Sequence, residues 1–167
     1  MKSIAKKAMA LSLGLMFVAA GCSKDDKTDE TTPPAKAIAG TYVGTLSQDG
    51  VVIVPSATIV ITAKGDDKIA LVFDAALPAA LFQQFVPDRT DPVSIQAICD
   101  EIPVTEVDGQ YTFSGSATTS LASISPFLSE IPLTISGNID KEGKAVITVA
   151  ISIMGLNLEI VFQGEKQ

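Results

Sequence analysis

Apolar and polar side chains alternate along most of this chain, from Ile38 to its last residues. Successive side chains of a strand point to opposite faces, so this alternation predicts strands with one buried and one solvated face. About eight segments carry the pattern: residues 40–47, 58–63, 68–73, 93–104, 111–118, 131–139, 144–153 and 156–162. The chain is therefore predicted to be all-β.

Most of these segments are joined by short links rich in Gly and Asp, such as 64–67, 106–109, 140–143 and Met154-Gly155. Such residues favour tight turns between antiparallel strands. About eight consecutive antiparallel strands can close on themselves, and closure removes the unpaired edges of an open sheet. We therefore expect an up-and-down β-barrel. An open sandwich is the structural alternative.

Two longer links interrupt the alternation. The first, at 74–92, contains a helix-compatible stretch at 78–86, with Pro78 suited to the first turn and Phe82 and Phe85 on one apolar face. We expect one short helix there. It would either plug one end of the barrel, which we favour, or form a lid over a ligand cavity. The second link, 120–130, carries Leu121 and Phe127 and is expected to line one of the two barrel mouths.

The first 21 residues have the features of a secretory signal. Three lysines precede an apolar run at 8–20, which is shorter than the roughly 20 residues of a membrane span. The run ends in Ala19-Ala20-Gly21-Cys22, a lipobox, in which the thiol of Cys22 takes the lipid before cleavage. We expect residues 1–21 to be removed and Cys22 to anchor the protein in the outer membrane, so the lipid provides its contact with the membrane.

Residues 22–37 form a polar, charged segment closed by Pro33-Pro34, and we expect a disordered tether. Its start, Ser23-Lys24-Asp25-Asp26, resembles the acidic surface-export signal of lipoproteins from gut anaerobic bacteria. The alternative is ordinary linker charge. Residues 38–167 would then form the single folded domain.

Composition excludes several function classes. Without residues 1–21, nine basic residues remain against nineteen acidic ones, and this acidity disfavours binding to nucleic acids. The chain has no histidine, which removes Ser-His-Asp and Cys-His catalysis and most transition-metal sites. Asp100 and Glu101 are adjacent on a predicted strand, so they would point to opposite faces and make a poor acid–base pair. We expect a protein that is not an enzyme and has no cofactor or metal.

The chain has two cysteines, Cys22 and Cys99. With Cys22 acylated, Cys99 has no partner for a disulfide within the chain, and we interpret it as a small buried residue. The domain must then be stabilised by burial of apolar side chains alone.

Three stretches carry a family resemblance: Gly40-Thr41-Tyr42-Val43-Gly44-Thr45-Leu46, Tyr111-Thr112-Phe113-Ser114-Gly115-Ser116 and Ile135-Ser136-Gly137-Asn138-Ile139-Asp140. They resemble the calycin-like β-barrel domain of secreted lipoproteins from anaerobic bacteria, over roughly residues 38–164. The resemblance implies a small lipocalin-like barrel with no general biochemical activity attached.

True lipocalins carry Gly-x-Trp in the first strand and an arginine of the last strand that packs over the indole. This chain has Gly40-Thr41-Tyr42 at the equivalent start, no tryptophan, and Arg89 as its only arginine. We expect Tyr42 to close the barrel floor by burying its ring with the hydroxyl bonded. The missing arginine weakens any transfer of lipocalin ligand binding.

The residues predicted to face inward are nearly all aliphatic or Phe, which suits a small apolar ligand or a solid interior. Our first hypothesis is a non-enzymatic module that binds such a ligand at the barrel mouth, with Phe82, Phe85, Leu121 and Phe127 as the candidate lining. The alternative is a surface interaction module for glycan or protein, with a barrel filled by side chains.

Overall fold

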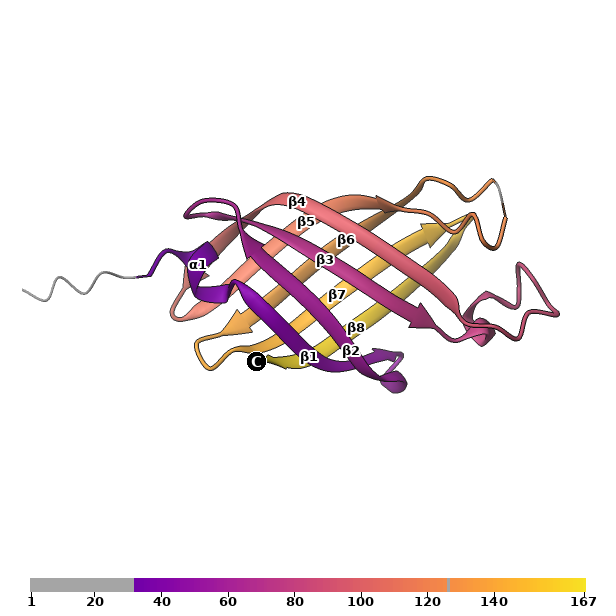
Figure 1. The fold of residues 1–167 in the computed structure, drawn as a ribbon, viewed down its shortest axis with the longest axis horizontal. Coiled ribbons are helices and arrows are strands. Elements are labelled where there is room, and N and C mark those ends of the chain that lie inside the picture. Colours follow the sequence, from indigo (N-terminus) through magenta and orange to yellow (C-terminus); the bar gives the residue numbers. More distant parts are fainter. Residues whose placement is uncertain (1–31, 126) are drawn as a thin grey trace, which may run out of the picture. The chain divides into compact units, whose positions relative to one another are not determined.

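The computed structural model describes residues 32–125 and 127–167, which form one closed antiparallel barrel of eight strands (Figure 1). Strands follow one another around the barrel in sequence order, and the last pairs with the first. The prediction of an eight-stranded up-and-down barrel is confirmed. The predicted signal peptide and the lipidated Cys22 lie outside the described residues.

The described part of the domain contains two short helical elements and eight strands. The helical elements are α1 (Pro34–Ile38) and the 3-10 turn η1 (Ala79–Phe82). The strands are β1 (Gly40–Gln48), β2 (Val51–Ala63), β3 (Lys68–Leu77), β4 (Val93–Val107), β5 (Gln110–Thr119), β6 (Ile131–Asp140), β7 (Lys144–Ile153) and β8 (Leu156–Lys166). No helix within the described residues is long and apolar enough to cross a membrane.

The sequence alternation becomes the inside and outside of the barrel. In β7, for example, Ala145, Ile147, Val149, Ile151 and Ile153 are buried. The residues between them face outward and are exposed or partly so. Burial of such side chains from all eight strands supplies the main stabilising term of the domain.

The barrel has two distinct ends. At the first, which we call the α1 end, α1 lies with the β2–β3, β4–β5 and β6–β7 turns and the end of β8 (Figure 1). The amide of Ala35 donates a hydrogen bond to the carbonyl of Asp66, and the amide of Lys166 donates to Gly143. At the second, which we call the distal end, lie the β1–β2 turn, the 78–92 and 120–130 links and the β7–β8 turn.

Helix α1 starts earlier than the predicted domain boundary. The expected tether, 22–37, overlaps α1, which begins at Pro34 and buries Ala35 and Ile38 completely. Proline suits the first turn of a helix, because its missing N–H would have no partner there. The prolines that suggested a linker therefore begin a helical cap, and order begins at least three residues before the predicted boundary at 38.

Barrel closure depends on two glycines. Gly44 of β1 pairs with Gly164 of β8. A Cβ on Gly44 would lie 2.1 Å from the carbonyl oxygen of Gln163 and 2.5 Å from the Cα of Gly164. We call this pairing of β1 with β8 the closing seam. The strands approach each other there more closely than any side chain allows.

The 78–92 link contains one short helix, as predicted, but it is a single 3-10 turn instead of a helix over 78–86. Pro87 disfavours helical geometry at the residue before it, which limits the length of the helix. The amides of Phe85 and Val86 both donate to the carbonyl of Phe82, which ends the turn compactly.

Candidate functional site

Side chains fill the interior of the barrel. Its largest fully buried members include Tyr42, Phe73, Phe82 and Phe162, packed among Ile, Leu and Val. Thr119 is the one buried polar residue in the described part of the chain, and its hydroxyl donates to the carbonyl of Gln96 at 2.7 Å. The interior therefore has no free polar group to orient a guest.

The structure places the four residues predicted to line a ligand site differently. Phe82 and Leu121 are completely buried in the core, and Phe85 packs against it from a half-buried position. Phe127 points away from the core and is 93% exposed, so it does not pack with the other three. The link turns back between Leu121 and Leu128, whose amide and carbonyl bond at 2.7 Å, and Leu128 is buried in place of Phe127.

The distal plug, which we define as Phe82, Phe85, Leu121 and Leu128, comes from both long links. Arg89 ties these links together, because its guanidinium donates to the carbonyl of Ser123 at 3.0 Å and to that of Asp91 at 3.1 Å. The plug predicted from the sequence, and favoured there over a lid, agrees with this packing.

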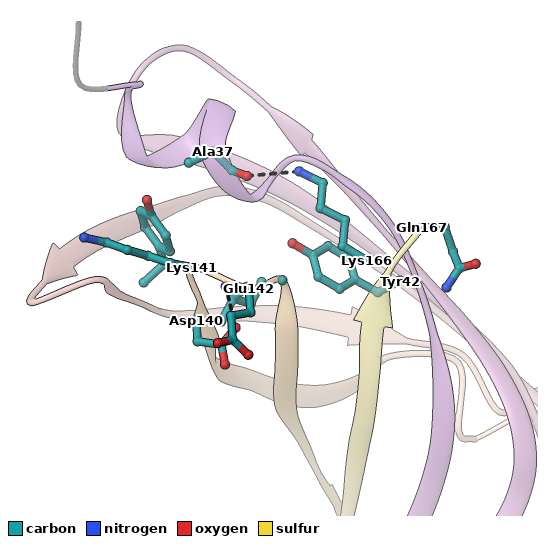
Figure 2. Close-up of a pocket in the computed structure, with 10 residues that line it drawn as sticks. Ala37, Tyr42, Asp140, Lys141, Glu142, Lys166 and Gln167 are labelled. Atoms are coloured by element: carbon teal, nitrogen blue, oxygen red, sulfur yellow. Dashed lines mark hydrogen bonds between the residues drawn. The ribbon is translucent and has the colours of Figure 1, made fainter. Parts of the chain in front are cut away.

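The α1 end carries a surface pocket of about 360 Å³ (Figure 2). Its lining comes from α1, β1, β5, the β6–β7 turn and the end of β8: Ala37, Tyr42, Tyr111, Ile139, Asp140, Lys141, Glu142, Gly143, Lys166 and Gln167. None of these except Tyr42 was identified from the sequence. They come from positions up to 130 residues apart, and only closure of the barrel brings them together.

Tyr42 lies at the floor of this pocket. Figure 2 shows Tyr42 among the residues that line the pocket. Its ring is buried and its hydroxyl donates to the carbonyl of Ile38 at 2.7 Å. Burial raises the pKa of Tyr42 to about 12. The phenol therefore stays protonated at physiological pH and is committed to its backbone partner.

The acidic groups of the pocket also take part in hydrogen bonds and an ion pair. One carboxylate oxygen of Asp140 accepts hydrogen bonds from the amides of Glu142 and Lys144, each at 2.9 Å. The carboxylate of Glu142 pairs with the ammonium of Lys144 at 2.7 Å, and this contact raises the pKa of Lys144. Lys166 donates to the carbonyl of Ala37 at 3.0 Å (Figure 2). These contacts hold the turn and α1 in place, so the pocket has the chemistry of a structural cap.

A second hollow, of about 420 Å³, lies on the outside of the closing seam. Val43, Val146 and Gln163 form part of its lining. Like the pocket at the α1 end, it is open to the surface.

Two further kinds of site were considered in the described part of the chain, a metal site and a reactive cysteine. Residues 32–125 and 127–167 contain no group of three or more Cys, Asp or Glu side chains arranged to hold a metal ion. The thiol of Cys99 is buried and donates to the carbonyl of Ser116 at 3.1 Å. Burial, assisted by the charge of Asp100, raises the pKa of Cys99, which keeps it in the unreactive thiol form.

Comparison with known proteins gives one match. The family model of the calycin-like beta-barrel domain matches residues 38–165, nearly the whole of the described domain. Neither the curated proteins nor the solved structures contain a significant match.

Proposed function

Because the chain belongs to the calycin-like beta-barrel domain family, we propose that it is a non-enzymatic binding module that recognises its partners at the outside of a filled barrel. The observation that supports this most directly is the interior, where the buried hydroxyls of Thr119 and Tyr42, set among aliphatic and aromatic side chains, are both already bonded. Of the two functions that the sequence suggested, this favours the surface interaction module.

The engagement of three ionisable groups at the α1 pocket supports the same proposal. Tyr42, Asp140 and Glu142 are each engaged in contacts that hold the fold. A general acid or base must be within reach of a substrate proton and free to exchange it. The contacts of these three groups stabilise the α1 end of the barrel instead.

A fluorescent apolar probe tests the filled interior. The wild-type protein should give no saturable binding, whereas Phe82→Ala, which removes the fully buried aromatic ring of the distal plug, should gain it. The variant is therefore a positive control for access to the interior. Saturable binding to the wild type, or a small apolar molecule that copurifies with it in equal amount, would overturn the proposal.

The rival function, an apolar ligand at the distal mouth, requires the plug to move. Phe82 and Leu121 would have to leave the core and the Arg89–Ser123 hydrogen bond would have to open. Exposing two large apolar side chains costs several kcal/mol, about 1.5–3 for each. An apolar ligand would need to recover that free energy before it gained any net affinity.

The proposed module is held at the outer membrane by a lipid on Cys22. The basic start, apolar run and lipobox of residues 1–22 support this. Metabolic labelling with a palmitate analogue tests it on the two cysteines of the chain. Cys22→Ser should abolish the label, whereas Cys99→Ser should keep it. Equal labelling of the two variants would refute the anchor.

A further inference from the structure

One hairpin of the barrel has an unexpected turn residue. Three two-residue turns join paired strands: Asp49-Gly50, Asp108-Gly109 and Met154-Gly155. The first residue has a positive φ in each, 51° for Asp49, 52° for Asp108 and 47° for Met154. This left-handed geometry suits Asp, Asn and Gly, and it strains a residue such as Met.

Packing does not compensate for this strain. The side chain of Met154 is 83% exposed, so burial contributes little to keep it there. Proteins tend to break a local rule of this kind at functional positions, where another requirement acts on the residue. Met154 therefore marks the distal end as a surface with a role other than folding.

Phe127 is a second large apolar residue at the same end. The backbone around it is bonded, since Leu128 donates to the carbonyl of Ser125 and Leu121 donates to that of Leu128. Within this bonded link Leu128 points inward and Phe127 outward. Strands β6 and β7 are neighbours, so the connections that carry Phe127 and Met154 emerge side by side (Figure 1). Val51 and Val52 add exposed apolar surface at the β1–β2 turn.

Lysines are divided unevenly between the two ends, although the α1 end also carries nine carboxylates, within 66–67, 100–108 and 140–142 and at Glu165. All six lysines of the described residues lie at the α1 end, in α1, the β2–β3 and β6–β7 hairpins and the end of β8: Lys36, Lys64, Lys68, Lys141, Lys144 and Lys166. The distal connections carry the exposed acidic residues Asp49, Asp88, Asp91 and Glu130. Their one basic residue is Arg89, which bonds to backbone carbonyls. The distal end is thus both apolar and acidic.

We propose that the distal end is a docking surface for a basic polypeptide segment that carries apolar side chains. Phe127 and Met154 are its apolar contacts, and the carboxylate of Glu130, on the same link as Phe127, complements the partner's cations. Methionine suits such a surface because its flexible thioether adapts to different partners. The proposal rests on the proposed function, since it names the partner class of a module that binds at its outside.

Charge complementarity selects this occupant over two others. A second copy of the chain docked by the same end would bring the same carboxylates against themselves, and an anionic membrane would repel them.

The test uses residues 22–167 with Cys22→Ser, which lack both the apolar signal segment and the lipid and so need no detergent, and a labelled amphipathic peptide of Lys and Leu. Fluorescence anisotropy should show saturable binding. Peptides in which Glu replaces Lys, or Ser replaces Leu, should bind at least about tenfold more weakly. No binding of the Lys–Leu peptide, or equal binding of the Ser-substituted one, would overturn the proposal.

Variants locate the surface. Phe127→Ser with Met154→Asn should weaken binding of the peptide at least about tenfold. Val107→Ser with Val146→Ser is the matched control, because it removes two exposed apolar residues from the other half of the barrel and should leave binding unchanged. Equal loss in both pairs would overturn the proposal, as would preferential binding to anionic vesicles or self-association that Phe127→Ser abolishes.

The unfolding midpoint of Met154→Asn gives a second measurement, which separates a strained contact residue from a residue with a purely structural role. Asn adopts positive φ readily, so this variant should raise the unfolding midpoint while it weakens peptide binding. A lower midpoint would overturn the interpretation of Met154 as a strained contact residue. Binding of the apolar probe to wild-type protein would refute the proposed function without altering the peptide result, so the two failures are distinguishable.

Discussion

The guanidinium of Arg89 donates a hydrogen bond to the backbone carbonyl of Ser123 at 3.0 Å, and this contact joins the two longest connections of the barrel. Residues 34 positions apart thereby hold the distal plug closed from outside. In lipocalins an arginine packs over the barrel floor from the last strand. Here the one arginine of the chain lies at the end of the barrel opposite to Tyr42.

Arg89→Ala should loosen the two links without unfolding the barrel. The bonds that it removes are exposed, so we expect a loss of less than about 1 kcal/mol in the free energy of unfolding. Hydrogen exchange should become faster in residues 121–128 and stay unchanged in β7. Arg89→Lys is the conservative control, and its single ammonium should restore only part of the protection, since it cannot bond in two directions as the guanidinium does. Unchanged exchange in 121–128 would contradict the role of the bond.

Gly44→Ala should disrupt the closing seam. Its Cβ would meet backbone atoms of Gln163 and Gly164, which cannot move aside as a flexible side chain can. We expect a loss of about 3 kcal/mol or more, at the upper end of overpacking costs. Thr41→Ala on the exposed face of the same strand should change stability by less than about 0.5 kcal/mol. Chemical denaturation measures both, and similar losses would contradict the steric explanation.

The stability of the domain should fall in alkali through Tyr42. A tyrosine of an unfolded chain titrates near pH 10, whereas burial raises the pKa of Tyr42 to about 12. The neutral form is thus favoured by folding, so this contribution is complete below about pH 10 and is lost as the pH rises toward 12. Its size is on the order of 2 kcal/mol.

Tyr42→Phe isolates that contribution. Near neutral pH the variant should be about 1 kcal/mol less stable, because the carbonyl of Ile38 loses its partner. At about pH 11 the difference should shrink or reverse, because Phe cannot ionise. Urea unfolding at the two pH values measures this. A constant difference would show that Tyr42 does not titrate with unfolding.

Cys99 should resist thiol reagents in the native state. The thiol is 1% exposed, and burial with the charge of Asp100 raises its pKa. In the Cys22→Ser protein, where it is the remaining cysteine, Ellman's reagent should react only as fast as the domain unfolds. Denaturant should accelerate the reaction in step with the loss of β structure. Rapid reaction of the folded protein would contradict the burial of this side chain.

Strand periodicity was sufficient to predict the barrel, because each strand buries one face and a slip of one residue would expose it. The prediction is wrong where the period breaks. Asp100 and Glu101 were expected on opposite faces, but Glu101 has a φ of 56° and the register with β3 shifts at this point. This bulge turns both carboxylates outward, toward Lys64 and Lys68.

The site was harder to predict than the fold. Phe127 and Leu128 are adjacent and both apolar, so composition alone cannot tell which of them enters the core. Only the return of the 120–130 link, fixed by the Leu121–Leu128 hydrogen bond, makes that choice. Met154 carried a usable signal, since Met-Gly stands where the other two-residue turns have Asp-Gly.

The confinement of lysines to the α1 end has a practical consequence for locating the protein on cells. Trypsin, which cleaves after Lys and Arg, finds only Arg89 on the distal connections, and that side chain is engaged with Ser123 and Asp91. A domain displayed toward the medium would thus keep its distal connections uncut in trypsin, although Lys24 and Lys27 of the predicted tether would let trypsin release it from the cell. Release of an intact domain, rather than resistance to trypsin, is therefore the expected sign of outward display, and a protease of broad specificity would also cut the chain beside Phe127.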